Sequence, residues 1–453
     1  MSITVELSQF VAETRSGDIP PQVRDRALAL VTDFAASAIR AAEDCPSSHV
    51  IFRTLDRLGM AAEGDCTVFG LSRRYGAAAA ALLNGAFGHS LDFDDTHADS
   101  SLHPSAPVVP AALAAAELTG ASGADLLAAV VIGFEVCCRL GMALDPASHY
   151  ARGFHPTATA GGFGAAAAAG RLLGLNAQGI EAAFGIAASQ ASGSLQFLEN
   201  GAWNKRYQVG EAAMKGLMAA TLASDDFVGA LDALNGRHGF LKGYSDAADP
   251  AKAVADLGGV WETMRIGVKP YPACRYTHAA VDGLLELCRT EGIGAADISR
   301  IVVGLHRNGI ALVGAPLPAK RRARSIVEGQ FSMPFAAAVA LQRGRFGWDD
   351  YDLLGTAETD ALSDRIEVQH DGSLEGLRHP FGATLRVETR GRVIERRIAD
   401  PSGEPETFPS AAASEAKFRS LTDPVRNGGT ADWLELMRGL SGAPLVSAHL
   451  KQA

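Results

Sequence analysis

The sequence has few aromatic residues and no large cluster of positive charge. Aromatic side chains make up 7% of the 453 residues, and 51 acidic against 41 basic residues give a formal net charge of −10. A nucleic-acid-binding surface needs clustered lysine and arginine. The one basic run, Lys320 to Arg324, is short, and we interpret it as a solvated loop. We therefore expect no nucleic acid among the partners, although local cations in a dry cleft could bind a small anion.

The cysteines and the apolar runs exclude further classes. Six cysteines are scattered without a CxxC pair or a Cys/His spacing suited to zinc. The first residues, MSITVELSQF, lack the basic and apolar regions of a secretory signal. The longest apolar run, Leu126 to Phe134, is shorter than the roughly 18 residues that a membrane span needs. We expect a protein of the reducing cytoplasm with no membrane contact.

Small residues are abundant instead. Hydrophobic residues make up 47% of the chain and glycine contributes 49 residues, which favours closely packed helices in a globular protein. The length predicts two or three domains. After Pro20-Pro21, the segment VRDRALALVTDFAASAIRAA has helical apolar spacing. Further helices are predicted at residues 75–89, 106–118, 124–141, 157–173, 180–192 and 210–223.

The pattern changes near residue 265. Strands are predicted at residues 299–305 and 364–368, and a hairpin at 383–398 turning at Arg390-Gly391. Helices are predicted between them at 278–289 and 329–341, and helix returns at 413–440. We predict a mainly α protein, with a large all-helical domain built from both chain ends (1–266 and 404–453) and a smaller α+β lid domain (267–403).

The richest segment for chemistry is LDFDDTHADSSLHPS, from Leu91 to Ser105. It interleaves imidazoles with carboxylates after an apolar helix, and prolines stiffen its exit. A solvated loop is the alternative. Its candidate residues are Asp92, Asp94, Asp95, Thr96, His97, Asp99 and His103. The aspartates also suggest the magnesium–diphosphate motif of helical isoprenoid synthases. A second aspartate-rich motif is missing, and the chain is poor in the aromatics that line such cavities.

Three further segments combine polar groups with a rigid backbone. They are GFHPTATAGGFG with His155, GAWNKRYQVGEAA with Lys205 and Arg206, and VKPYPACRYTH with Lys269, Cys274, Arg275, Tyr276 and His278. The alternatives are a helix-cap neighbour, an exposed lysine in a loop before a helix, and an interdomain linker. The glycines of the first segment lack the preceding strand of a dinucleotide-binding fingerprint, so we interpret them as close helix contacts.

Together these segments resemble the MmgE/PrpD family. The matching stretches are NGAFGHSLDFDDTH, HPSAPVVPAALAAAE, GFHPTATAGGFGAAAAAGRLLGL, GIAASQASGSLQFLENGAWNKR, VKPYPACRYTH and DPSGEP, in family order. The family holds 2-methylcitrate dehydratases, cis-aconitate decarboxylases and an iminodisuccinate epimerase. The resemblance implies a helical domain with an α+β lid, a homodimer, and catalysis without metal or organic cofactor.

The resemblance also implies a set of pocket residues. The matching positions are Asp92, Thr96, His103, His155, Lys205 and Lys269. Two positions depart from the family pattern. Cys274 stands where the decarboxylase branch is expected to have histidine, and Gln208 stands where many members have histidine. Both departures change the acid–base groups, so the sequence alone favours reactions other than decarboxylation.

From this set we assign expected roles in a reaction at a carbon next to a carboxylate. Lys205 and Lys269, helped by Arg275 and with Tyr276 among the binding residues, would hold the substrate carboxylates where enolate charge grows. His103 would be the general base or acid and His155 its partner. Asp92 would orient a histidine, Thr96 would bond a carboxylate or hydroxyl, and Cys274 would be an acid on the second face.

The sequence therefore predicts a cofactor-independent enzyme acting on a small di- or tricarboxylic acid. The favoured reaction is that of a 2-methylcitrate dehydratase, a carbon–oxygen lyase. The alternatives are an epimerase of an imino- or amino-dicarboxylate, a cis-aconitate-type decarboxylase, and a binding protein of the same fold without catalysis.

Overall fold

The chain forms two compact units in its computed structural model, which describes residues 2–376, 379–425 and 432–451. Unit 1 comprises Met1–Ser90, Asp94–Ile266 and Ala411–Ala453, and unit 2 comprises Leu91–Phe93 and Gly267–Ser410. A two-residue strand, β3 (Ile266–Gly267), lies where the chain passes from unit 1 to unit 2. The mainly helical composition predicted from the sequence is confirmed. The predicted domain limits at 267 and 404 stay a prediction, since compact packing does not show that either part folds alone.

Unit 1 is helical apart from two short strands, β1 (Glu63–Cys66) and β2 (Thr96–His97). Its helices are α1 (Ile3–Glu13), α2 (Pro21–Asp44), α3 (Pro46–Arg57), α4 (Ala77–Gly88), α5 (Ser105–Thr119), α6 (Gly123–Ala143), α7 (Pro146–Ala151), α8 (Pro156–Thr159), α9 (Gly161–Leu172), α10 (Ala177–Ala188), α11 (Asn204–Ser224), α12 (Phe240–Tyr244), α19 (Ala411–Thr422), α20 (Trp433–Gly439) and α21 (Val446–Leu450). As predicted, α2 begins at a proline, whose fixed φ suits the first helical turn.

Small residues let the central helices approach one another closely. A Cβ added to Gly133 of α6 would lie 2.8 Å from the carbonyl oxygen of Gly164 in α9, and one added to Gly164 would lie 2.6 Å from that of Gly133. Between α4 and α11, a Cβ on Gly210 would lie 2.4 Å from the Leu82 carbonyl oxygen. These distances are too short for any other residue, so the close helix contacts expected from the glycines are confirmed at these positions.

Three predicted helix boundaries were wrong. The helix predicted at 157–173 is divided into α8 and α9 at Ala160, and that predicted at 180–192 ends at Ala188. The third error concerns α11, which begins at Asn204 rather than at Gly210. Trp203, the residue before α11, makes no capping hydrogen bond with its side chain, so the sequence carries no start signal there.

Helix α6 is long and apolar enough to cross a membrane by length and composition. However, 94% of its most apolar 18-residue window is buried inside the protein. It packs against α9 and α5, and its buried face carries Glu135 and Arg139. This burial is typical of the central helix of a protein core.

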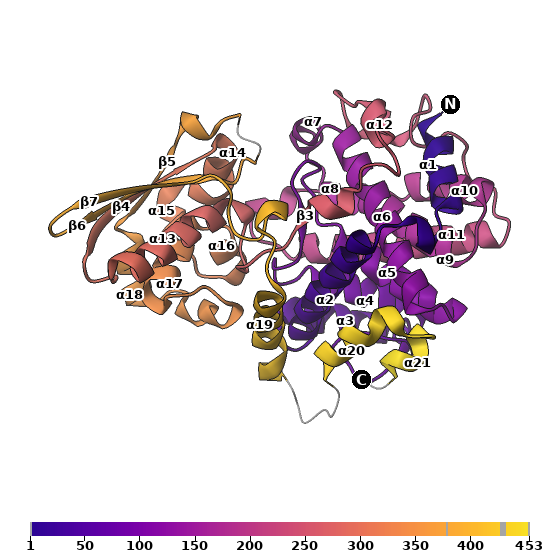
Figure 1. The fold of residues 1–453 in the computed structure, drawn as a ribbon, viewed down its shortest axis with the longest axis horizontal. Coiled ribbons are helices and arrows are strands. Elements are labelled where there is room, and N and C mark those ends of the chain that lie inside the picture. The colour runs from indigo at the N-terminus through magenta and orange to yellow at the C-terminus, as the bar shows by residue number, and fades with distance from the viewer. Residues whose placement is uncertain (1, 377–378, 426–431, 452–453) are drawn as a thin grey trace. The chain divides into compact units, whose positions relative to one another are not determined.

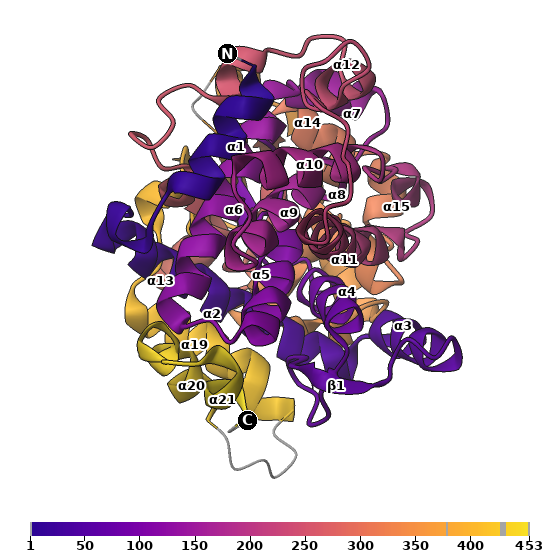
Figure 2. The same cartoon turned by 90° about the vertical axis from the view of Figure 1, so that its right-hand side faces the viewer.

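The C-terminal helices return to unit 1. Helices α19 and α20 pack against α2, and α21 packs against α5 (Figure 2). Lys417 of α19 places its Nζ 2.7 Å from Oδ1 of Asp33 in α2, and both side chains are largely buried. The return of helix after the α+β segment is thus confirmed, although residues 426–431 of the predicted stretch lie outside the described residues.

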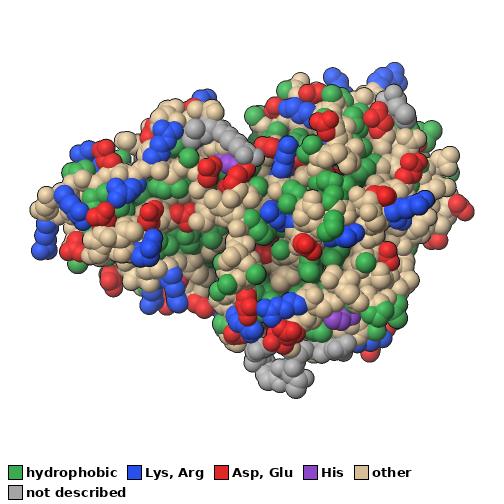
Figure 3. All heavy atoms as spheres, viewed as in Figure 1, with side chains coloured by type: hydrophobic (Ala, Val, Ile, Leu, Met, Phe, Trp, Pro, Cys, Tyr) green, Lys and Arg blue, Asp and Glu red, His purple; other side chains and the backbone are tan. Residues whose placement is uncertain are grey.

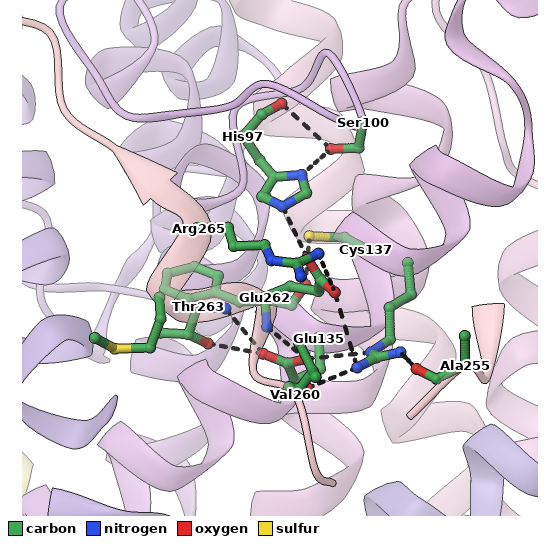
Figure 4. A network of polar contacts seen from close by, with 12 residues as sticks. His97, Ser100, Glu135, Cys137, Ala255, Val260, Glu262, Thr263 and Arg265 are labelled. Atoms are coloured by element: carbon green, nitrogen blue, oxygen red, sulfur yellow. Dashed lines mark hydrogen bonds and ion pairs between the residues drawn. The ribbon is translucent and has the colours of Figure 1, made fainter. Parts of the chain in front are cut away.

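A buried polar network fixes the segment around Glu262 to helix α6 (Figure 4). Glu135 accepts hydrogen bonds from the backbone N–H groups of Glu262 (3.0 Å) and Thr263 (2.9 Å), and it also pairs with Arg139. Glu262 in turn accepts from Nε2 of His97 at 3.2 Å. Burial raises the pKa of Glu262, but His97 and the neighbouring arginines more than offset this effect and lower it overall. Through Glu262, the network fixes His97, which lies between α4 and α5, to helix α6.

Unit 2 contains a mixed four-stranded sheet of order β5-β4-β6-β7 (Figure 1). Its strands are β4 (Ile298–Leu305), β5 (Ile366–His370), β6 (Ala383–Thr389) and β7 (Val393–Ile398), and its helices are α13 (His278–Glu291), α14 (Arg307–Gly309), α15 (Leu317–Lys320), α16 (Ile326–Gln330), α17 (Met333–Arg343) and α18 (Ala357–Ser363). Strand β4 pairs in parallel with β5 and antiparallel with β6. The predicted strands and the hairpin at 383–398 are confirmed, with β5 displaced by two residues from the predicted 364–368. The helix predicted at 329–341 is instead divided between α16 and α17.

Helices α13 and α17 pack on the sheet, and α13 contacts β6 and β7. Along β6, Leu385 and Val387 are buried while Arg386 is exposed, as the alternating pattern predicted. Two arginines of the basic run at residues 320–324, before α16, form ion pairs. Arg322 lies 2.8 Å from Asp364 and Arg324 lies 2.6 Å from Asp360. On the face drawn in Figure 3, lysine and arginine lie among aspartate and glutamate.

Replacing Glu135 with leucine should strongly destabilise unit 1. The change leaves the N–H groups of Glu262 and Thr263 without their acceptor and Arg139 without its nearest carboxylate. Breaking a buried ion pair typically costs about 3–5 kcal/mol. Urea unfolding measures the loss. Asp246→Asn, which breaks a solvent-exposed pair with Arg152, is the control and should cost less than about 1 kcal/mol. Equal losses for both variants would contradict the structural role of the network.

Candidate functional site

The carboxylates between α4 and α5 are not a solvated loop. Asp92, Asp94 and Asp95 are 3%, 0% and 1% exposed, whereas Asp99 is exposed. Burying several carboxylates costs much free energy unless each is protonated, paired or hydrogen-bonded. Each of the three has a different environment. Asp94 and Asp95 belong to unit 1 and Asp92 to unit 2.

Asp94 connects two histidines in unit 1. Nδ1 of His89, the residue after α4, donates to Oδ2 of Asp94 at 2.6 Å. Nδ1 of His103 lies 3.6 Å from the same oxygen and donates to the backbone oxygen of Asp95 at 2.7 Å. The two rings meet edge to face, with centroids 4.8 Å apart. The other oxygen of Asp94 is buried and has no hydrogen-bond partner among the described residues. Imidazole rings held by hydrogen bonds to neighbouring oxygens can transfer protons.

Asp95 has a different role from Asp94. Its carboxyl group accepts from the Ser105 hydroxyl at 2.6 Å and from the Ser105 N–H at 3.2 Å. Burial, followed by the nearby charge of Asp94, raises the pKa of Asp95 well above its ordinary value, although the Ser105 bonds partly offset this. Burial also raises the pKa of Asp33 in α2, and the charge of Lys417 partly offsets this rise. The environment of Asp95 thus disfavours a second carboxylate charge beside Asp94.

His155 joins the two histidines from the start of α8. It is 3% exposed, its ring is stacked with that of His89 at 5.9 Å, and it lies edge to face with Phe197 at 5.8 Å. Nδ1 of His155 lies 2.8 Å from Nε2 of Gln208 in α11. Lys205 lies three residues before Gln208, in the first turn of α11. The interpretation of Lys205 and Arg206 as loop residues was therefore wrong. We call His89, His103 and His155 the histidine cluster.

In unit 2 the predicted residues Asp92 and Lys269 form a buried pair. Nζ of Lys269 lies 3.1 Å from Oδ1 of Asp92 and donates to its backbone oxygen at 3.0 Å. Both residues are at most 3% exposed. Asp92 has a φ of 53°, which non-glycine residues seldom adopt. Strained backbone held by a buried charge is characteristic of functional sites.

Arg275, predicted to help bind substrate, is instead engaged within unit 2. Its Nη2 lies 2.6 Å from Oε1 of Glu404, and both side chains are buried. Its Nη1 donates to Nδ1 of His278 at 2.9 Å. Burial, then the charges of Arg275 and Lys269, lower the pKa of His278 well below its ordinary value. This guanidinium therefore holds Glu404 and a neutral His278 in position.

The remaining predicted residues of unit 2 lie close to Arg275. Cys274 is 7% exposed, and its N–H donates to the Gln330 oxygen at 2.8 Å. Tyr276 is 8% exposed and packs edge to face against Phe381, with ring centroids 5.0 Å apart. In unit 1, the Thr96 hydroxyl is buried and has no hydrogen-bond partner among the described residues. A buried hydroxyl of this kind is available to a ligand.

One group of side chains has the spacing to hold a metal ion. Ligand atoms of His89, Asp94 and His103 lie within 4.8 Å of one another. In the structure, however, the Nδ1 atoms of both histidines are used in hydrogen bonds to oxygen. These bonds involve only one nitrogen of each ring, and catalysis without metal stays a prediction.

The sequence did not single out His89, Lys417 or Glu404, although each pairs with a buried charged group in the structure. His89 stands in the quoted stretch NGAFGHSLDFDD and was treated only as a helix end. Its position five residues before Asp94 was the available signal. Lys417 and Glu404 act through partners far away in sequence, which no local pattern indicates.

Comparisons with known proteins match the chain over most of its length. The family model of the MmgE/PrpD N-terminal domain matches residues 5–253, and that of the MmgE/PrpD C-terminal domain matches residues 271–437. A cis-aconitate decarboxylase-like protein, oryM, of Aspergillus oryzae is 32% identical over 425 residues, covering 89% of this chain and 87% of that protein.

Two further relatives are named as cis-aconitate decarboxylases. That of Aspergillus terreus (strain NIH 2624 / FGSC A1156) is 32% identical over 447 residues, covering 93% of this chain and 90% of the relative. The protein of Homo sapiens is 34% identical over 210 residues, covering 45% of this chain and 43% of its own length.

Replacing Asp95 with asparagine should change how stability depends on pH. Because the folded protein keeps the Asp95 proton after the unfolded chain has lost it near 3.8, the stabilisation is complete below that pH and declines as pH rises. The decline amounts to at most about 1.4 kcal/mol per pH unit. Urea unfolding from about pH 5 to about pH 8 should show Asp95→Asn gaining stability relative to the wild type. Exposed Asp99→Asn is the control, and a pH-independent difference for Asp95→Asn would contradict the assignment.

Proposed function

The chain belongs to the MmgE/PrpD family, and on this basis we propose that it is a lyase that decarboxylates a small tricarboxylic acid of the cis-aconitate type. The support is the match to cis-aconitate decarboxylases over nearly the whole chain. These relatives favour decarboxylation over the dehydration of 2-methylcitrate that the sequence analysis put first. The observation that carries the proposal is the histidine cluster, with His89 and His155 buried and His103 partly exposed, in a chain of this ancestry.

Decarboxylation needs two things from the protein. Cleavage of the carbon–carbon bond releases CO₂ and leaves the electron pair on carbon, where the adjacent double bond and carboxylates delocalise it. A proton donor must then add one proton to the carbon framework. Positive charge and hydrogen-bond donors stabilise the intermediate where its negative charge grows. Neither step requires an oxidant or a reductant.

We assign proton transfer to the histidine cluster. His103 and His155 are the proposed acid–base pair, and Asp94 orients His89 and His103 through its buried carboxylate. A positioned acid–base group typically contributes about 10²–10⁴-fold to the rate. Burial and the neighbouring Asp94 raise the pKa of Asp95, which disfavours a second anion beside the cluster.

We assign carboxylate binding to Lys205 and Lys269, with the Thr96 hydroxyl as a further donor. Lys269 is held by Asp92 in unit 2, which fixes its ammonium group before substrate binds. Lys205 lies in the first turn of α11, where the helix dipole also favours an anion. Arg275 supports this arrangement through Glu404 and His278, and Tyr276 remains a proposed binding residue.

A second candidate reaction is favoured by Cys274. A thiol stands where the decarboxylase branch of the family is expected to have histidine, so the proton-transfer groups differ from that branch. A hydro-lyase acting on 2-methylcitrate or an epimerase of an imino-dicarboxylate would use the same carboxylate-binding residues. Both reactions remove a proton from a carbon next to a carboxylate, which the histidine cluster could also perform.

The expected homodimer and the cytoplasmic location stay predictions. Unit 1 has an apolar groove of about 350 Å³ between α3 and the start of α11, lined in part by Leu58, Trp203 and Tyr207. Such exposed apolar side chains are frequent at protein interfaces.

Incubation of the purified protein with cis-aconitate in D₂O should give bicarbonate and one deuterated product, followed by NMR. The parallel substrates are 2-methylcitrate, citrate and the stereoisomers of iminodisuccinate. An olefinic product from 2-methylcitrate without bicarbonate would establish the hydro-lyase instead, and deuterium with inverted configuration would establish the epimerase. No reaction with any of them would favour a binding protein. Activity that EDTA abolishes and Mg²⁺ restores would contradict catalysis without metal.

His103→Ala should lower kcat by about 10²–10⁴-fold, because the variant loses a positioned proton-transfer group. Steady-state kinetics with the accepted substrate measure the effect, and circular dichroism checks the fold. His238→Ala removes an exposed histidine and is the matched control. Retention of more than about a tenth of kcat by His103→Ala would rule out its assigned role.

A further inference from the structure

We propose that Gln208 is a positioning residue that fixes the tautomer of His155, so that this neutral ring presents Nε2–H as a hydrogen-bond donor in the histidine cluster. This inference deepens the proposed function and rests on it, because only a reaction at the histidine cluster gives this Nε2–H group a catalytic role. The geometry behind it is the contact of 2.8 Å between Nε2 of Gln208 and Nδ1 of His155. An amide nitrogen only donates hydrogen bonds, so Nδ1 of His155 must accept and the ring proton must lie on Nε2.

The orientation of the Gln208 amide is set by a second hydrogen bond. The N–H of Ser194 donates to Oε1 of Gln208 at 3.2 Å. If the amide were turned over, its nitrogen would face the N–H of Ser194, two donors would oppose each other, and this bond would be lost. The backbone therefore determines which end of the amide faces His155.

The backbone around Ser194 is itself fixed to that of His155. The N–H of His155 donates to the Gly193 oxygen at 3.0 Å, and that of Leu195 donates to the Gly153 oxygen at 2.9 Å. Gly193 has a φ of 144°, and a Cβ there would lie 2.6 Å from Cβ of Ala158. Only glycine allows this close approach, which brings the Ser194 N–H to the amide.

His103 is held in the opposite tautomer. Its Nδ1 lies 2.7 Å from the backbone oxygen of Asp95, and a carbonyl oxygen only accepts. The proton of the neutral ring is therefore on Nδ1, which leaves Nε2 as the basic nitrogen. In the neutral cluster, His103 thus offers a basic nitrogen and His155 a hydrogen-bond donor.

The side chain at position 208 determines how strongly one tautomer of His155 is favoured over the other. The sequence has glutamine where many family members are expected to have histidine. A histidine could donate or accept, because its own proton can move between two nitrogens. A glutamine amide has no such freedom. The amide also disfavours a proton on Nδ1 of His155, because two donors would then meet.

The test reads the tautomer directly by ¹⁵N NMR on protein labelled at histidine, near neutral pH and without substrate. The signal of His155 is assigned by its loss in His155→Asn. We expect a protonated Nε2 and an unprotonated Nδ1 in the wild type. Gln208→Glu, whose carboxylate accepts from Nδ1, should move the proton to Nδ1 or protonate both nitrogens. Gln190→Glu places the same charge change on the same small cavity and should leave the His155 signals unchanged.

Kinetics supply the second readout. Gln208→Glu should lower kcat by about 100-fold, Gln208→Leu by about 10-fold, and Gln190→Glu by less than about twofold. A wild-type His155 protonated on Nδ1, or a tautomer that Gln208→Glu leaves unchanged, would overturn the inference. Because the spectra are recorded without substrate and need no turnover, a failure of the decarboxylase proposal is distinguishable from a failure of this one.

Discussion

The arrangement of unit 1 depends on one buried negative charge, the carboxylate of Asp94. A charge removed from water is tolerated only where hydrogen bonds and partners replace the lost hydration. His89 donates a hydrogen bond to this carboxylate, His103 lies 3.6 Å from it, and burial raises the pKa of the neighbouring Asp95. The same contacts orient the two imidazole rings. The histidines around the Asp94 carboxylate are therefore also groups that the proposed chemistry uses. Stability and activity are linked at these residues.

The sequence predicted much of the fold, because local physical signals identify most of its elements. The proline at the start of α2 and the alternation along β6 and β7 were sufficient. The start of α11 was missed, since Trp203 provides no capping bond. The break between α8 and α9 carries no local signal either. Close helix packing was predictable from glycine content, but the particular pair Gly133 and Gly164 depends on which helices meet.

The candidate site was less predictable than the fold. Resemblance and local pattern pointed to Asp92, His103, His155 and Lys269, and the structure gives each a buried polar partner or ring contact within its own unit. The sequence did not indicate that Arg275 is held by Glu404, which lies 129 positions further along the chain. It showed Gln208 as a departure from the family but not its orientation, which depends on a backbone N–H of another segment. Partner choice across long separations requires the folded chain.

The ion pair between Lys417 and Asp33 has a consequence for the order of biosynthesis. Asp33 leaves the ribosome early, whereas the helix that supplies its cation is among the last parts to be translated. Until α19 docks, Asp33 lacks its counter-ion and its burial beside Asp94 is opposed. Residues 267–410 are complete before this happens. The helical unit therefore stays incompletely folded while the other unit is synthesised. The ion pair between Lys417 and Asp33 forms only near the end of translation.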